Sequence, residues 1–239
     1  MEKNKLKLSL IIPCYNEYKN LRLLVEKISK LDYKHLEIII VNNGSTDNTK
    51  FLANELIKNE SKFKLLNIQK NIGYGHGIMT GVKEASGDII AWTHADLQTD
   101  PNDVIDVFNA YIHLPKFENS IIKGYRKGRN FFDFSFTYFM GLISSFLLKV
   151  KLSDINAQPK MFHRNFLKYL DKYPNDFSMD LFLLYQARSN DIAIHQYPVD
   201  FKKRLHGKAK GGGSIIGKIR LIIRTFSYIL KLKSKLKIK

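Results

Sequence analysis

The sequence predicts an α/β protein whose sheet is mostly parallel and has helices on both faces. In the first half of the chain, short apolar runs alternate with amphipathic stretches of helical spacing. Such an order of strand and helix implies right-handed crossover connections and therefore parallel strands. With 239 residues, 44% of them hydrophobic, the chain is long enough to bury a substantial core.

The predicted strands are apolar runs that end at proline or at polar residues. They cover residues 8–12, 36–41, 63–68 and 89–93. The predicted helices carry apolar residues at helical spacing within residues 21–31, 51–57, 77–85 and 104–108. Pro101 is expected at the first position of the last of these helices, because proline is favoured there.

The second half is less regular. Residues 134–148 carry no formal charge, but a membrane-spanning helix needs about 20 apolar residues. This run also contains serine and threonine, so we expect an interfacial or a core helix.

The net charge of +17 is concentrated near the carboxyl end. Residues 202–239 hold 13 of the 39 Lys and Arg and no Asp or Glu, which leaves +4 for the remainder. Within this region, apolar residues of 215–230 form one helical face beside basic residues. This pattern is typical of a helix on an anionic membrane surface. A helix packed on the body, followed by a solvated lysine tail, shows the same pattern.

Composition also bears on location. Cys14 is the single cysteine, so no intrachain disulfide can form. Residues 1–7 are charged and lack the apolar core of a signal peptide. We therefore predict a cytoplasmic protein.

Polar segments follow three of the predicted strands, at residues 14–17, 42–48 and 94–98. Ligands of parallel sheets bind beyond these carboxyl ends. His94, Asp96 and Gln98 present nitrogen and oxygen donors at alternate positions, a set that suits Mn²⁺ or Mg²⁺. Taken alone, a His-x-Asp sequence is more often a hydrogen-bonded pair at a strand end.

Four segments occur in a characteristic order: residues 11–17 (IIPCYNE), 41–49 (VNNGSTDNT), 71–88 and 95–101 (ADLQTDP). In order and spacing they resemble the signatures of family 2 glycosyltransferases, and most of all the dolichyl- or polyprenyl-phosphate sugar synthases. The resemblance weakens after residue 130 and runs to about residue 214. It implies a GT-A fold in residues 1–214, followed by a basic amphipathic extension in 215–239.

The resemblance also implies a divalent metal and a nucleoside-diphosphate sugar. Its matching positions suggest that donor-binding residues border the base, ribose and diphosphate, namely Pro13, Tyr15, Glu17, Asn42, Asp47 and Arg204. Arg126 matches a position that approaches the acceptor phosphate. Lys208 is a further candidate cation, although solvated charge is the usual state of such a lysine.

Two departures from the family pattern concern the base and the metal. Asn42 and Asn43 stand where paired aspartates are usual, which bears on base preference because an amide both donates and accepts. His94 replaces the first aspartate of the metal motif. Because neutral imidazole suits Mn²⁺ better than Mg²⁺, we expect manganese to be favoured. The alternative is that Asp96 and Gln98 hold the metal without His94.

The acceptor decides whether a catalytic base is needed. A polyprenyl phosphate is already anionic and can attack the anomeric carbon directly, with Asp96 and Arg126 as the expected catalytic residues. A sugar hydroxyl of a surface glycan must lose a proton, and Asp180 is the candidate base. Asp180 could equally be a first-turn aspartate stabilised by the helix dipole.

We therefore predict an inverting glycosyltransferase, peripheral on the inner face of the membrane. A non-catalytic protein that binds lipid or nucleic acid through its tail would leave the four ordered motifs unexplained, and no nucleic-acid partner is expected.

Overall fold

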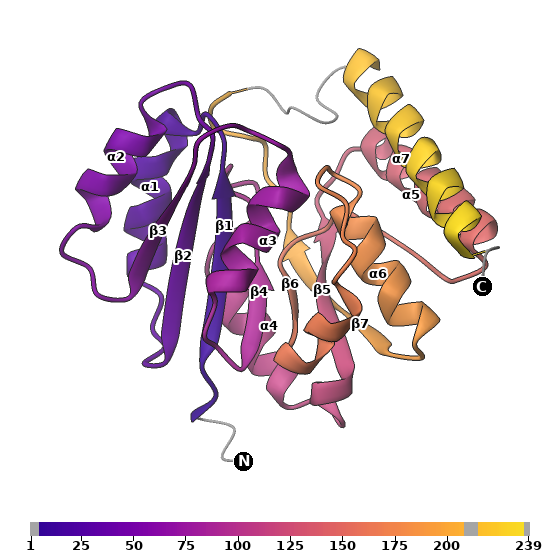
Figure 1. The fold of residues 1–239 in the computed structure, drawn as a ribbon, viewed down its shortest axis with the longest axis horizontal. Helices are drawn as coiled ribbons and strands as arrows, with labels where there is room; N and C mark the ends of the chain where they lie inside the picture. The colour runs from indigo at the N-terminus through magenta and orange to yellow at the C-terminus, as the bar shows by residue number, and fades with distance from the viewer. Residues whose placement is uncertain (1–4, 208–214, 237–239) are drawn as a thin grey trace.

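The computed structural model describes residues 5–207 and 215–236. Its centre is a seven-stranded sheet of order β3-β2-β1-β4-β6-β5-β7 (Figure 1). The strands are β1 (Leu8–Cys14), β2 (Leu36–Asn43), β3 (Phe63–Ile68), β4 (Ile89–Trp92), β5 (Ser120–Lys127), β6 (Lys160–His163) and β7 (Ala193–Asp200). The α-helices are α1 (Tyr18–Ser29), α2 (Thr49–Ile57), α3 (Tyr74–Glu84), α4 (Asp103–Ile112), α5 (Phe131–Leu148), α6 (Met179–Ser189) and α7 (Ile215–Leu236). Two short 3-10 helices are η2 (Phe117–Asn119) and η3 (Arg164–Tyr169).

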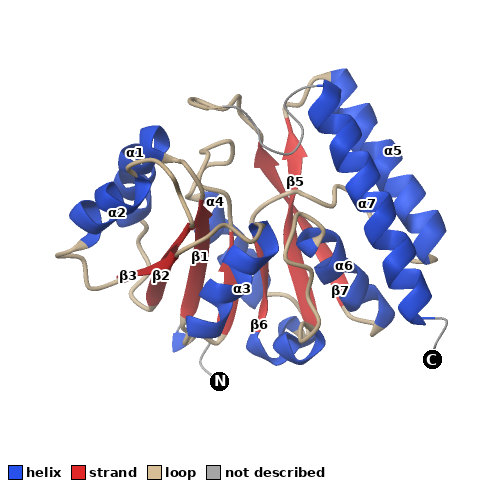
Figure 2. Cartoon of the chain, turned by 45° about the horizontal axis from the view of Figure 1, so that its top comes forward, coloured by secondary structure: helices blue, strands red, loops and turns tan. Residues whose placement is uncertain are grey.

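The first half of the fold confirms the predicted alternation of strand and helix. Strands β3, β2, β1 and β4 are parallel neighbours, and apolar side chains fill both faces of this part of the sheet. Helices α1, α2 and α4 pack on one face, and α3 and α6 on the other (Figure 2). The polar segments after β1, β2 and β4 therefore meet at one edge of the sheet.

The start of α4 differs from the expectation. Pro101 lies in a turn and the helix begins at Asp103. The turn is held by side chains, because Asp103 Oδ2 accepts from the Asp100 amide at 3.1 Å and Asp100 Oδ1 accepts from the Asn102 amide at 3.0 Å. These local bonds compete with helical ones and delay the helix by two residues.

The second half adds strands that no apolar periodicity had indicated. Strand β6 lies antiparallel between β4 and β5, while β7 pairs with β5 in parallel. At four residues β6 is too short to show a pattern, and it begins with the buried Lys160. The sheet is thus mixed, with the antiparallel strand β6 fifth in the order of seven, next to the central strand β4.

Two glycines at the start of α3 join the halves of the chain. Gly75 donates its amide to the Asp176 carbonyl at 3.2 Å, and the His76 amide bonds Asn175 at 3.0 Å. A Cβ at Gly75 would lie 2.2 Å from the Pro174 carbonyl oxygen, and one at Gly73 would lie 2.3 Å from that of Asn175. Only glycine permits this approach of backbone to backbone.

Helices α5 and α7 lie side by side at one end of the molecule (Figures 1 and 2). Only Gly141, Ser144 and Leu148 of α5 are buried, and its exposed side chains are largely aromatic. By length and composition alone, α5 is the single helix of the described chain that could cross a membrane. Of the two positions expected for residues 134–148, the core position does not hold for most of the helix, and the interfacial position stays a prediction.

The apolar stripe of α7 is divided between two environments. Ile229 is fully buried in a cluster with α5 and α6 residues such as Leu148 and Leu184. Ile223 and Leu230 are about 60% exposed. The helix thus packs on the body, as one of the two interpretations held, and still presents apolar surface outward.

Candidate active site

A cavity of about 860 Å³ lies at the carboxyl ends of the strands. Residues from both halves of the chain line it, including segments after β1 and β4, the end of β5 and helices α5 and α7. Nine of the predicted site residues are among them: Pro13, Tyr15, Glu17, His94, Asp96, Gln98, Arg126, Asp180 and Arg204.

The segment after β4 turns sharply at Leu97, which has a φ of +58°. This left-handed residue places Asp96 and Gln98 on the same side, and Asp96 Oδ1 accepts from the Gln98 amide at 3.2 Å. Arg204 closes the site from the loop after β7, with Nη2 at 2.6 Å from Asp96 Oδ2 and Nη1 at 3.3 Å from Glu17 Oε1. The guanidinium thereby links the first and fourth motifs.

The imidazole of His94 packs beside Tyr74, with ring centroids 5.5 Å apart. Burial lowers the pKa of His94, and the nearby carboxylates of Asp96 and Asp180 oppose this effect. The ring is therefore uncharged at neutral pH, which leaves a nitrogen lone pair for a metal ion.

The last residues of β2 and the loop after it form hydrogen bonds within the protein. The Asn42 amide bonds Asn67 Oδ1 at 3.0 Å, and Asp47 caps Thr49; neither Asn42 nor Asp47 lines the cavity. Asn43 lines it instead, and its buried Oδ1 has no hydrogen-bond partner. The contacts of Asn42 and Asp47 with a donor stay predictions, and Lys208 lies outside the described residues.

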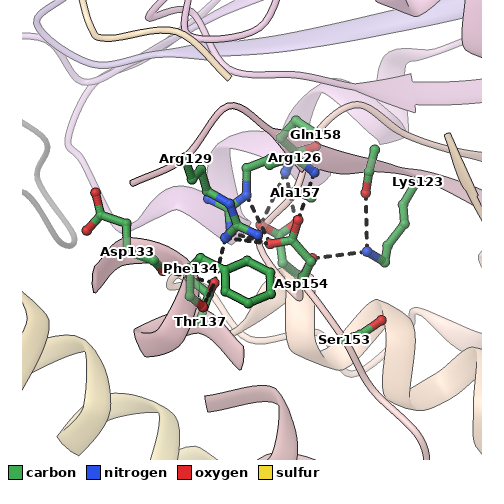
Figure 3. Close-up of polar contacts among 12 residues, drawn as sticks. Lys123, Arg126, Arg129, Asp133, Phe134, Thr137, Ser153, Asp154, Ala157 and Gln158 are labelled. Atoms are coloured by element: carbon green, nitrogen blue, oxygen red, sulfur yellow. Dashed lines mark hydrogen bonds and ion pairs between the residues drawn. The ribbon is translucent and has the colours of Figure 1, made fainter. Parts of the chain in front are cut away.

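Two arginines converge on Asp154 at the other end of the cavity (Figure 3). Arg126 donates its amide to Asp154 Oδ2 at 2.9 Å and its Nε to Oδ1 at 3.0 Å, and Arg129 Nη1 lies 3.3 Å from Oδ1. Burial alone would raise the pKa of Asp154, but Arg126 lowers it below its usual value. Sequence reasoning missed Arg129, although it follows Arg126 by only three residues.

Asp180 lines the cavity and is itself buried in a polar network. It accepts hydrogen bonds from Trp92 Nε1 at 3.3 Å and Gln158 Nε2 at 3.2 Å, and it pairs with Lys160 Nζ at 2.9 Å. Burial lowers the pKa of Lys160, and the adjacent carboxylate counteracts part of that effect. In this geometry Asp180 neutralises the buried ammonium group of Lys160. Its role as a base stays a prediction.

The sequence profile described as glycosyl transferase family 2 matches residues 9–167. The match covers well over half of the chain, including most of β1, all of β4, Arg126 of β5 and Arg129. The chain belongs to this family.

Curated relatives include polyprenyl-phosphate sugar synthases. The chain is 28% identical to dodecaprenyl-phosphate galacturonate synthase of Rhizobium johnstonii over 96% of its own length and 66% of that protein. It is 37% identical to undecaprenyl-phosphate 4-deoxy-4-formamido-L-arabinose transferase of Yersinia enterocolitica over 41% of the chain and 31% of that protein. The chain thus spans less than two thirds of the length of either relative.

Solved structures show the same GT-A fold. Mannosyltransferase PcManGT of Pyrobaculum calidifontis, in complex with GDP-Man and Mn²⁺, superposes with a TM-score of 0.70 at 19% identity, over 95% of this chain and 64% of the other. Glucosyl-3-phosphoglycerate synthase of Mycobacterium tuberculosis, in complex with Mn²⁺, UDP and phosphoglyceric acid, gives a TM-score of 0.73 at 17% identity, over 95% and 80%. The predicted fold class is confirmed.

The residues predicted to hold a metal ion provide only part of a coordination sphere. His94, Asp96 and Gln98 line one cavity, with one nitrogen, one carboxylate and one amide oxygen to offer. No group of three His, Cys, Asp or Glu that could hold a metal ion occurs in residues 5–207 and 215–236. A hard divalent cation would therefore need diphosphate oxygens to complete its coordination.

Proposed function

We propose that this glycosyltransferase moves a sugar from a nucleoside-diphosphate sugar to a polyprenyl phosphate, with inversion at the anomeric carbon. The observation that carries the proposal is that one cavity is lined by both groups of predicted site residues. It joins Pro13, Tyr15 and Asp96 at one end to Arg126 and Arg129 at the other. Donor and acceptor phosphate would thus face each other within one enclosed space.

In this proposal an acceptor phosphate oxygen forms a bond to the anomeric carbon as the bond to the diphosphate oxygen breaks. Arg126 holds the acceptor phosphate, and Arg204 lies beside the leaving nucleoside diphosphate. His94, Asp96 and Gln98 would hold a divalent cation, which would stabilise the negative charge on that leaving group, and neutral imidazole favours Mn²⁺. No base is required, in keeping with the fully bonded state of Asp180.

The end of the molecule formed by α5 and α7 supports a membrane location for this reaction. Residues on α5 and α7 line the cavity, so an acceptor chain can leave it toward these helices. The two helices expose large apolar side chains, and basic residues Lys149, Arg220 and Lys231 are exposed beside them. This combination suits the headgroup region of an anionic membrane at the cytoplasmic face.

Transfer assays with the full chain test the proposal. Radiolabelled UDP-glucose, UDP-galacturonate and GDP-mannose are each incubated with undecaprenyl phosphate in vesicles and Mn²⁺. We expect a lipid-linked sugar from one of them, and a loss of roughly 100-fold or more in kcat/KM for Asp96→Asn, because charge on the leaving group is then less stabilised. Asp106→Asn, an exposed aspartate of α4, should retain full activity.

Transfer to a glycan hydroxyl but not to the lipid phosphate would favour the runner-up function, in which Asp180 acts as the base. In that case Asp180→Asn should abolish turnover while the protein stays folded. Full-rate lipid transfer by Asp96→Asn would contradict the assigned role of Asp96.

A further inference from the structure

Helix α7 reaches the cavity through Arg224 and Thr225. The Arg224 guanidinium carbon lies 5.8 Å from the centre of the Phe177 ring, a cation–π distance. Phe177 stacks on Tyr74, with ring centroids 5.1 Å apart and planes at 15°, and Tyr74 in turn packs on His94. A column of rings thus connects the carboxyl-terminal helix to the metal motif.

Arg224 differs from the other arginines of the cavity in its partners. Arg126 and Arg129 are paired with Asp154, and Arg204 with Asp96 and Glu17. Within residues 5–207 and 215–236, Arg224 has no salt bridge, and its guanidinium lies over the ring of Phe177. Its N–H donors are therefore available to an anion in the cavity.

Arg129 has a hydrogen-bond donor, its Nε, that has no partner in the protein. Its side chain is 5% exposed, and its buried Nε has no hydrogen-bond partner. The same guanidinium is fixed by Asp154 and by Thr137 Oγ1 on α5, so its orientation is set before any ligand arrives. A buried unpaired N–H on a charged group is costly unless a ligand completes it.

We infer that Arg224 binds the phosphate of the acceptor together with Arg129, so that α7 is part of the acceptor site. This rests on the proposed function, of which it names a specificity-determining residue. A phosphate monoester carries up to two negative charges and can accept from two guanidinium groups at once. Phe136 and Met140 of α5 line the same cavity and suit the first isoprene units.

The ligand class follows from this arrangement. Cations from α7 and from the loop before α5 recognise the phosphate, and apolar side chains of α5 recognise the chain attached to it. A free phosphate lacks the apolar part and a neutral glycan lacks the charge. The site therefore selects a phosphate monoester on an apolar chain.

A membrane role of Arg224 must be separated from phosphate binding. A short-chain prenyl phosphate in solution, without vesicles or detergent micelles, removes the membrane from the experiment. Its dissociation constant is measured by calorimetry for the wild type, Arg224→Gln, Arg224→Lys and Arg220→Gln. Arg220 is exposed on the same helix and does not line the cavity, so its variant removes the same charge.

We expect Arg224→Gln to weaken binding of the prenyl phosphate by roughly 10- to 100-fold, as for the loss of a charged hydrogen bond. The affinity of Arg224→Lys should lie between those of the wild type and Arg224→Gln, because lysine keeps the positive charge but lacks the planar guanidinium group. Arg220→Gln should bind like the wild type. Affinity for the nucleotide sugar should be unchanged in every variant, which also verifies the fold.

Equal binding by the wild type and Arg224→Gln would overturn this inference and leave the proposed function standing. A loss of equal size in Arg220→Gln would also overturn it, because general charge would then explain the effect. If the wild type binds the nucleotide sugar but no prenyl phosphate, the proposed function itself fails.

Discussion

At the scale of single residues, two positions with left-handed backbone lie next to residues that line the cavity. Leu97 and Asp154 are not glycine, yet they have φ angles of +58° and +39°. Such conformations cost about 1–2 kcal/mol each and persist where surrounding contacts fix them. Leu97 lies between Asp96 and Gln98 of the predicted metal motif. Asp154 forms ion pairs with Arg126 and Arg129. Both positions thus use local strain to place charged groups.

The arginine pair depends on one carboxylate, and this gives a test. Asp154→Asn should lower the free energy of unfolding by about 3–5 kcal/mol, because it leaves Arg126 and Arg129 without their buried counter-charge. Chemical denaturation at neutral pH measures this loss. Asp191→Asn is a matched control, since Asp191 also has a positive φ but is exposed. A loss below about 1 kcal/mol, as for an exposed pair, would contradict the assigned role.

The same carboxylate has a pH signature. Because its pKa is lowered in the folded state, its stabilisation is complete above the unfolded value of about 3.9 and is lost as the pH falls through the folded pKa. The difference in stability between the wild type and Asp154→Asn should therefore shrink only below about pH 4. A constant difference down to lower pH would exclude a charge effect.

At the scale of elements, α5 is the feature that packing within the chain explains least. Phe132, Phe139 and Phe146 are 79%, 60% and 84% exposed. Exposed aromatic surface of this extent marks an interaction site, and the basic neighbours favour an anionic membrane.

We expect the triple variant Phe132→Ser, Phe139→Ser and Phe146→Ser to bind anionic vesicles at least roughly tenfold more weakly, because each phenylalanine contributes apolar burial. Vesicle sedimentation measures the change. Phe51→Ser is the control, because Phe51 is 69% exposed on α2, at the opposite end of the molecule (Figure 1). Unchanged vesicle binding by the triple variant would leave α7 alone as the membrane contact.

The elements also show what the sequence could predict. The four strands of the first half consist mostly of apolar residues and are followed by polar residues, so their pattern is local and was interpreted correctly. Strand β6 begins with Lys160, whose burial is explained only by Asp180, twenty residues later in the chain. No local pattern contains that information.

The same limit applies to the site. His94, Asp96 and Gln98 are neighbours in sequence, and the structure brings them to one cavity as expected. Arg129 and Arg224 become site residues through the packing of α5 and α7, which periodicity does not specify. Asn42 and Asn43 are adjacent at the end of β2, and the sequence does not tell which of the two side chains lines the cavity. In the structure it is Asn43, whereas Asn42 bonds Asn67.

At the scale of the whole molecule, the cavity joins both halves of the chain, so ligand binding should stabilise the entire fold. With UDP or GDP at 100 times its dissociation constant and Mn²⁺ present, we expect the melting temperature to rise by roughly 5–10 °C. Mn²⁺ alone should give little shift, because the described chain holds no cluster of three strong ligands. Differential scanning fluorimetry compares the melting temperature with nucleotide and Mn²⁺ to that with Mn²⁺ alone. Nucleotide with Mg²⁺ is the third condition. A full shift with Mn²⁺ alone would contradict a cation that arrives with its substrate.

The backbone contact of Gly73 and Gly75 with residues 174–176 has a consequence for recombination between relatives. No side chain can enter that seam, so its shape is set jointly by two stretches about 100 residues apart in sequence. A chimera that takes only the second half of the chain from a relative would pack a foreign 174–176 backbone against these glycines. The close backbone contact between the two segments would then be lost. New acceptor specificity is therefore best sought by exchanging α5 and α7, which lie outside the seam, and donor specificity by changing the loops after β1 and β2.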